Sequence, residues 1–98
     1  MSGRITIMDI EKKRKDIDEI DDYIVKLFLK RMQVCGDIGR YKKENGIRAY
    51  DEKRENEIFA RVKAQAPDDM KEYIDLLYET VLGLSNAYQL EIINGEIQ

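Results

Sequence analysis

The chain has 98 residues, which fits a single domain, and its charged (38%) and hydrophobic (43%) content with one proline is typical of long helices. The net charge of −3 lacks the basic excess that marks a nucleic-acid-binding module. No apolar run approaches the ~20 residues that a membrane span requires, so we expect neither nucleic acid nor a membrane as partner.

The scarcity of cysteine and histidine limits the possible chemistry. Cys35 is the one cysteine, so no disulfide can form within the chain. One cysteine and no histidine argue against a zinc site and exclude an imidazole base. There is no glycine-rich phosphate loop, and we expect no metal and no cofactor. The first residues lack the apolar core of a secretory signal, which favours a cytoplasmic location.

The first predicted element is a long helix over residues 8–44, without proline and without glycine before Gly36. A helix of about 37 residues measures about 55 Å. A globule of this chain length has a radius of gyration of about 13 Å, so the helix must be covered by a partner outside its own chain. Two lines of apolar residues at seven-residue spacing form the seam of a helix pair. They are Ile10, Ile17, Ile24 and Ile38, and Ile20, Leu27, Val34 and Tyr41.

Two shorter helices are predicted after the long one. Asn45 and Gly46 end the first helix, and Asp51 is the expected N-cap of a second helix that reaches about Ala64. Pro67 opens a third helix that ends near Ile93. The expected fold is all-α, with a long, a short and a medium helix in one domain over residues 8–98. The predicted apolar face of the third helix is Met70, Ile74, Leu77, Val81, Leu84 and Tyr88.

Three cations of the first helix are candidates for a binding site. Arg31 occupies a seam position, where a charge costs stability unless it is paired, although a register-setting or snorkelling role also explains it. Lys42 lies about 16 Å further along the same side, so both could reach one anion. Arg14 is about 42 Å from Lys42 on a straight helix, and only across an antiparallel pair of chains could it approach the other chain's Arg31. Taken singly, Arg14 and Lys42 are also explained as surface residues.

The stretch RAYDEKRE, residues 48–55, raises the question of a charged surface or a site wall. Asp51, Arg54 and Glu55 share one helix face with Ile58 and Val62, by their spacing of three, four, seven and eleven residues. The N-cap role explains Asp51 without any function. It does not explain Arg54 and Glu55 on a face that the helix buries, so we favour a site wall.

Ser85 and Gln89 are neighbours one turn apart on the flank of the third helix's apolar face, where an amide is commonly structural. The whole set combines several cations, one carboxylate, one hydroxyl and one amide, without a nucleophile–base pair. Such a set binds a small dianion that carries a hydroxyl, and it can accelerate a reaction by positioning and electrostatics alone.

In these residues the chain resembles the all-helical chorismate mutases, over about residues 8–93. The family has an Arg early in the long helix, an Arg near its middle and a Lys near its end, which are Arg14, Arg31 and Lys42 here. A D-x-x-R-E motif at 51–55 then opens the second helix, and S-x-x-x-Q at 85–89 lies in the third. Each motif is loose, but eight positions match jointly. Residues 1–7 lie outside the resemblance and form an N-terminal tail, a candidate for disorder.

The resemblance implies an intertwined helical homodimer with two active sites, each taking Arg14 from the opposite subunit. It also implies the Claisen rearrangement of chorismate to prephenate, on the route to phenylalanine and tyrosine. That reaction is pericyclic and needs no proton transfer, covalent intermediate or metal, which suits a chain without histidine.

The resemblance also implies a role for each residue. Arg14, Arg31 and Lys42 hold the two carboxylates of chorismate. Lys42 and Gln89 donate hydrogen bonds to the ether oxygen, on which negative charge grows in the transition state. Glu55 and the Asp51 backbone bind the ring hydroxyl. The remaining two roles fall to Arg54, which orients Glu55, and Ser85, which contacts a carboxylate or shapes the pocket.

Two other functions compete with this interpretation. A lyase on the same scaffold would split isochorismate into salicylate and pyruvate with a similar cationic site, and the sequence separates it poorly from a mutase. A non-catalytic helical dimerisation module would explain the seam. It would give no reason for inward-facing Arg31, Arg54 and Glu55.

Overall fold

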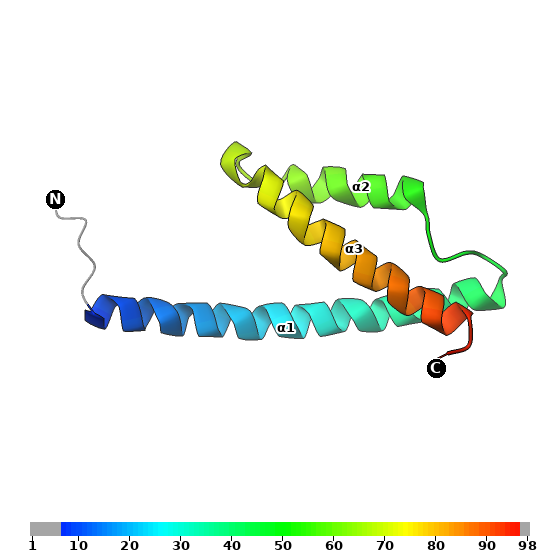
Figure 1. Cartoon of the computed structure of the whole chain (residues 1–98), viewed down its shortest axis with the longest axis horizontal. Coiled ribbons are helices and arrows are strands. Elements are labelled where there is room, and N and C mark those ends of the chain that lie inside the picture. Colours follow the sequence, from blue (N-terminus) through cyan, green and yellow to red (C-terminus); the bar gives the residue numbers. More distant parts are fainter. Residues whose placement is uncertain (1–6, 97–98) are drawn as a thin grey trace. The chain divides into compact units, whose positions relative to one another are not determined.

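The computed structural model describes residues 7–96, with side chains from Asp9 onward, and confirms the predicted all-α class. Three α-helices follow one another: α1 (Ile7–Glu44), α2 (Glu52–Lys63) and α3 (Lys71–Ile93) (Figure 1). A short 3₁₀ turn, η1 (Asp68–Met70), precedes α3. The long, short and medium order is therefore as predicted. Residues 1–6 of the expected tail lie outside the described part of the chain, and residue 7 already belongs to α1.

The chain divides into two compact units, one ending at Arg31 and the other beginning at Met32. The described part of the first unit consists of the N-terminal portion of α1. The second unit holds the rest of α1 together with α2, η1 and α3. Lys42, the 51–55 motif and the 85–89 motif all belong to the second unit.

Glycine ends both long helices by the same turn. Gly46 has φ 66° and Gly95 has φ 77°, a left-handed backbone that favours glycine. After α1, the Ile47 N–H donates to the Lys42 carbonyl at 2.8 Å, and after α3 the Glu96 N–H donates to the Glu91 carbonyl at 2.9 Å. These are the six-to-one bonds of the Schellman motif, and they satisfy carbonyls that a helix end leaves unpaired.

Side chains complete both ends of α2. The Asp51 carboxylate accepts a hydrogen bond from the Arg54 backbone N–H at 3.0 Å, which is the predicted N-cap. At the other end, the Lys71 ammonium donates to the carbonyls of Lys63 and Ala66, both at 2.9 Å. Lys71 therefore ties the start of α3 to the end of α2.

The core between α2 and α3 is small. Ile58 and Val62 of α2 pack with Leu82 of α3, and all three side chains are buried. Figure 1 shows that α2 and α3 form a helical hairpin. Partly buried apolar side chains surround this cluster: Phe59, Ile74 and Tyr78. Burying a side chain of this size stabilises the fold by about 1.5–3 kcal/mol.

The face of α3 that is buried differs in part from the predicted apolar face, of which Ile74, Val81 and Tyr88 are half-buried. Met70, Leu77 and Leu84 were expected to be buried and are exposed in this chain. The buried face lies one residue further round the helix, and its members are Leu82, Ser85, Gln89 and Ile92. Apolar residues occupy more than one face of α3, so their spacing alone did not identify the face that packs inside the chain.

Two glycines allow α1 to pack closely on α3 within the second unit. Gly36 and Gly39 are buried, and a Cβ built at Gly39 would lie 3.3 Å from the Cα of Gln89. A Cβ at Gly36 would lie 3.1 Å from the ring of Tyr88. A larger residue at position 39 would therefore displace the backbone that carries Gln89.

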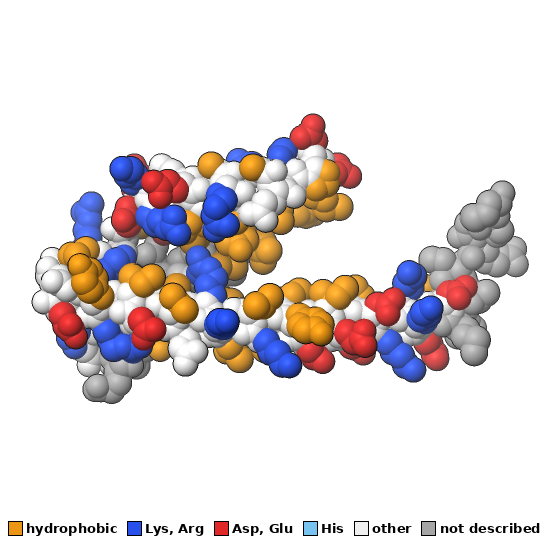
Figure 2. Space-filling model, turned by 180° about the vertical axis from the view of Figure 1, so that it is seen from behind, with side chains coloured by type: hydrophobic (Ala, Val, Ile, Leu, Met, Phe, Trp, Pro, Cys, Tyr) orange, Lys and Arg blue, Asp and Glu red, His pale blue; other side chains and the backbone are white. Residues whose placement is uncertain are grey.

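The apolar seam of α1 is exposed in a single chain. Ile24 is 57% exposed and Leu27 is 65% exposed, and hydrophobic side chains follow α1 on the face shown in Figure 2. The other strongly exposed seam residues are Ile17, Ile20, Val34, Ile38 and Tyr41. None of the helices within residues 7–96 carries a stretch long and apolar enough to cross a membrane.

Candidate functional site

The centre of the candidate site is Lys42, in the last turn of α1. Its ammonium donates to Gln89 Oε1 at 2.9 Å and to the backbone oxygen of Ala49 at 2.6 Å. These partners come from α3 and from the connector before α2. The Schellman turn at Gly46 directs that connector, so the local helix-ending chemistry helps to bring the Ala49 carbonyl to the ammonium.

The bond from Lys42 also fixes which way the Gln89 amide faces. An ammonium has only donors, so the amide oxygen must point at it and the amide NH₂ points elsewhere. Gln89 is only 7% exposed, and among residues 9–96 its NH₂ makes no hydrogen bond within the chain. Lys42 and Gln89 are therefore two adjacent side chains that each keep hydrogen-bond donors not used within the described residues.

Glu55, in the first turn of α2, is bound from α3. Its Oε2 accepts a hydrogen bond of 2.5 Å from the Asn86 amide, which is 31 residues away in the sequence. Both residues are half-buried. Glu55 therefore faces α3, and its place in a site wall stays a prediction.

Arg54 behaves differently from its neighbour. It was expected to orient Glu55, but its guanidinium lies 3.5 Å from Glu57, and both of these side chains are largely exposed. Asp51 is exposed as well, and its carboxylate serves the α2 N-cap. Among the described residues, then, the side chains of Arg54 and Asp51 make no hydrogen bond or ion pair with Glu55.

Ser85 is one turn before Gln89 on the buried face of α3 and is 5% exposed. Its hydroxyl donates to the Val81 carbonyl at 2.8 Å, which is the usual way for a serine inside a helix to satisfy its donor. The predicted role of Ser85 at the site stays a prediction.

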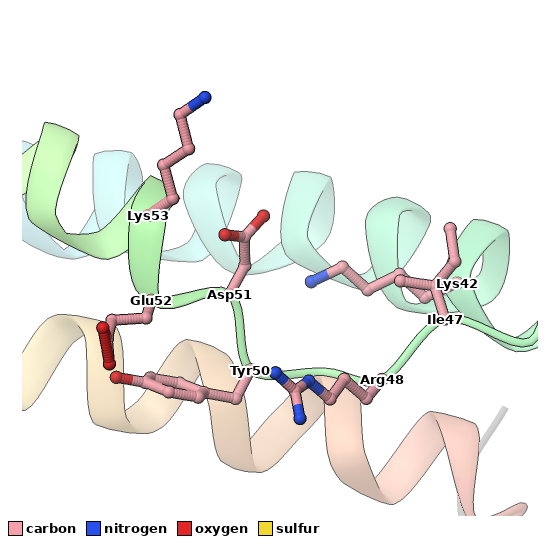
Figure 3. Close-up of a pocket in the computed structure, with 7 residues that line it drawn as sticks. All are labelled: Lys42, Ile47, Arg48, Tyr50, Asp51, Glu52 and Lys53. Atoms are coloured by element: carbon pink, nitrogen blue, oxygen red, sulfur yellow. The ribbon is translucent and has the colours of Figure 1, made fainter.

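A pocket of about 480 Å³ opens at the connector between α1 and α2, and Figure 3 shows its lining side chains. The Lys42 ammonium extends toward the Asp51 carboxylate in this view, and Arg48 and Tyr50 lie on the connector. Three cationic and two acidic side chains line the pocket, which suits an anionic ligand with a hydroxyl. The lining is Lys42, Ile47, Arg48, Tyr50, Asp51, Glu52 and Lys53.

Six of the eight predicted site residues belong to the second unit: Lys42, Asp51, Arg54, Glu55, Ser85 and Gln89. Arg14 and Arg31 belong to the first unit. Arg14 is exposed and Arg31 is half-buried. Their place at the site stays a prediction.

Three contributors were not found by sequence reasoning. Asn86 binds Glu55, the Ala49 carbonyl binds Lys42, and Gly39 allows α3 to approach α1. Asn86 stood inside the 85–89 motif but had no local pattern of its own. The two glycines three residues apart inside a helix were a usable signal, because glycine in a helix interior costs stability and usually marks a close approach.

On this helical scaffold Lys42 binds the Gln89 amide and Asn86 binds the Glu55 carboxylate, and polar groups of this kind can bind a small anionic ligand. The profile of the family "Chorismate mutase type II" matches residues 13–90. The chain therefore belongs to the chorismate mutase type II family. This confirms the resemblance found in the sequence.

Two curated relatives share part of the chain. A 3-dehydroquinate dehydratase of Pyrobaculum aerophilum is 34% identical over 77 residues, which are 79% of this chain and 23% of that protein. A chorismate mutase of Methanocaldococcus jannaschii is 40% identical over 50 residues, which are 51% of this chain and 50% of that protein. The chain thus spans about a quarter of the length of the first relative and half of the length of the second. No solved structure shows a significant match.

Proposed function

We propose that the chain is a chorismate mutase that converts chorismate to prephenate in the biosynthesis of phenylalanine and tyrosine. The observation that carries the proposal is the pairing of Lys42 with Gln89 on a scaffold of the chorismate mutase type II family. We do not propose dehydratase activity for this chain, because the match covers only 23% of the Pyrobaculum protein.

The rearrangement breaks the ether C–O bond of chorismate while a C–C bond forms between the enolpyruvyl arm and the ring. Electrons move within one molecule, and no proton is transferred. Negative charge grows on the ether oxygen in the transition state, and donors aimed at that oxygen lower the barrier. In our proposal the Lys42 ammonium and the Gln89 NH₂ are these donors, supported by their adjacency and by the burial of Gln89.

Glu55, with the Asp51 backbone, binds the ring hydroxyl in this proposal. Arg14, Arg31 and Lys42 hold the two carboxylates and fold the flexible arm over the ring, which supplies the orientation that a unimolecular reaction needs. Arg54 adds positive potential at the start of α2, and Ser85 contacts a carboxylate of the substrate or shapes the site beside Gln89. Support for this arrangement comes from the cationic lining of the pocket beside Lys42.

We also propose that residues 8–98 act as one domain within a homodimer, in which Arg14 crosses to the partner's site. Support comes from the exposed seam on α1, where Ile17, Ile24 and Leu27 are each more than half exposed in a single chain. Exposing an apolar stripe of this length to water is unfavourable, and pairing with a second copy of the chain would bury it.

The test follows chorismate consumption by ultraviolet absorbance, with the product identified by NMR. The wild type is compared with Lys42→Ala and with Lys43→Ala, a matched control because Lys43 is the exposed next residue of the same helix. We expect conversion to prephenate that Lys42→Ala abolishes and Lys43→Ala preserves. No turnover of chorismate by a folded protein would overturn the proposal. Salicylate and pyruvate from isochorismate would then identify the lyase, and inactivity on both substrates would leave a dimerisation module.

A further inference from the structure

Glu55 is bound by a residue that no sequence motif assigned to the site. The Asn86 amide nitrogen on α3 lies 2.5 Å from Glu55 Oε2 on α2, and both side chains are half-buried. A hydrogen bond to a carboxylate is stronger and shorter than one between neutral groups. The bond joins two helices and leaves Glu55 few of the rotamers that a glutamate in a first helical turn otherwise samples.

The geometry leaves one carboxylate oxygen available. Asn86 uses Oε2, and among residues 9–96 Glu55 Oε1 has no hydrogen-bond donor. The neighbouring cation does not compete, because the Arg54 guanidinium lies against Glu57 on the exposed side of α2. A ligand hydroxyl could therefore donate to Oε1 while Asn86 holds Oε2.

Asn86 is also placed beside the rest of the site. It lies three residues before Gln89, so both amides are on one side of α3. It lines a hollow of about 310 Å³ together with Ala49, whose carbonyl binds Lys42. One helix thus presents two amides, of which Gln89 binds the lysine and Asn86 binds the carboxylate.

We infer that Asn86 is a positioning residue that holds the Glu55 carboxylate so that its Oε1 receives the ring hydroxyl of the substrate. The inference rests on the proposed function, because it needs a hydroxyl-bearing ligand at Glu55. Asn86 itself touches no reacting atom. It acts through Glu55, and it replaces Arg54 in the role of orienting that side chain.

The test is a double-mutant cycle on steady-state kinetics with chorismate, using Asn86→Ala, Glu55→Ala and the double variant. The control is Asn56→Ala, which removes the same side chain from the exposed residue next to Glu55. Because the hydroxyl is held in the bound substrate and in the transition state alike, we expect Asn86→Ala to raise KM about tenfold with little change in kcat. In the Glu55→Ala background the same change should have no further effect, and Asn56→Ala should have none at all.

A second variant excludes a merely structural role. Asn86→Asp keeps the size of the side chain but places a second carboxylate at Glu55 in place of a donor, and we expect a larger rise in KM than for alanine. Urea unfolding should show that both variants remain folded. A loss of kcat with unchanged KM, or an equal loss in the Glu55→Ala background, would overturn the inference.

The proposed function and this inference fail in different ways. Absence of chorismate turnover by the wild type overturns the function and the inference with it. Turnover by the wild type that Asn86→Ala leaves unchanged overturns the inference alone.

Discussion

The Lys42 ammonium and the Gln89 amide oxygen are 2.9 Å apart, across 47 residues of sequence. This bond joins the last turn of α1 to the buried face of α3. It makes the lysine dependent on the exact placement of two helices.

The amide at position 89 makes a prediction about pH. An amide donates a hydrogen bond without being protonated, so this residue should cause no loss of kcat between pH 5 and 8. In Gln89→Glu the carboxyl group donates only while protonated, so kcat should fall as the pH rises. The measurement is kcat against pH for both proteins, with Gln65→Glu, at an exposed position of the α2–α3 connection, as control. A steep fall in the wild type that disappears in a variant changed only at position 89 would contradict this account.

The close approach of α3 at Gly39 predicts that alanine is tolerated less well at position 39 than at position 83. A Cβ at Gly39 would press on the Gln89 backbone at 3.3 Å, whereas a Cβ at Gly83 meets nothing within 4 Å. Both glycines are inside helices, so the gain in helix propensity is common to both alanine variants. We expect Gly39→Ala to be less stable than Gly83→Ala by about 1–3 kcal/mol, the usual cost of overpacking. Urea unfolding measures this difference, and only Gly39→Ala should also lower kcat/KM.

The side chain and the backbone of Asp51 are expected to have different roles, the first in stability and the second in substrate binding. Its carboxylate receives the Arg54 N–H, while the proposed contact with substrate uses the Asp51 backbone. Asp51→Ala should destabilise the protein by about 1 kcal/mol, and Asp51→Asn, which is also a good N-cap, should restore most of it. Thermal unfolding measures both. If Asp51→Asn folded normally and yet lost most of its kcat, the side chain itself would be part of the site.

Subunit complementation tests where Arg14 acts. Arg14→Ala and Lys42→Ala should each abolish turnover. If Arg14 serves the partner's site, a mixed dimer has one site in which Arg14 and Lys42 are both intact. Refolding equal amounts of the two variants together should therefore restore about a quarter of wild-type activity, since about half of the dimers are mixed. Activity that stays at the level of the separate variants would place Arg14 at its own chain's site or outside the site.

The ends of the helices could be predicted from the sequence because they depend on local chemistry. Gly46 and Gly95 supply the left-handed turn, and Asp51 supplies the N-cap, each within a few residues of the helix it ends. Lys42 and Gln89 were assigned to one site through the family pattern, and their hydrogen bond shows that they are adjacent in this chain.

The remaining features depend on contacts between distant segments. The buried face of α3 was misjudged because the apolar residues Leu77 and Leu84 are exposed, whereas the face that is buried includes the polar residues Ser85 and Gln89. Asn86 could not be recognised because its partner, Glu55, is on another helix and no spacing rule connects them. Arg54 was placed on an inward face by spacing alone, but its long side chain reaches out to Glu57.

The two hydrogen bonds of Lys42 fix the orientation of its ammonium group. An ammonium has three N–H bonds in a tetrahedral arrangement, and the Ala49 carbonyl and the Gln89 oxygen use two of them. Within the described residues, one N–H direction is left for a ligand. A free lysine is a mobile point charge that follows any nearby anion. Held in this way, the ammonium offers one N–H in a fixed direction. It can therefore distinguish isomeric anions by whether an oxygen of the ligand lies along that direction.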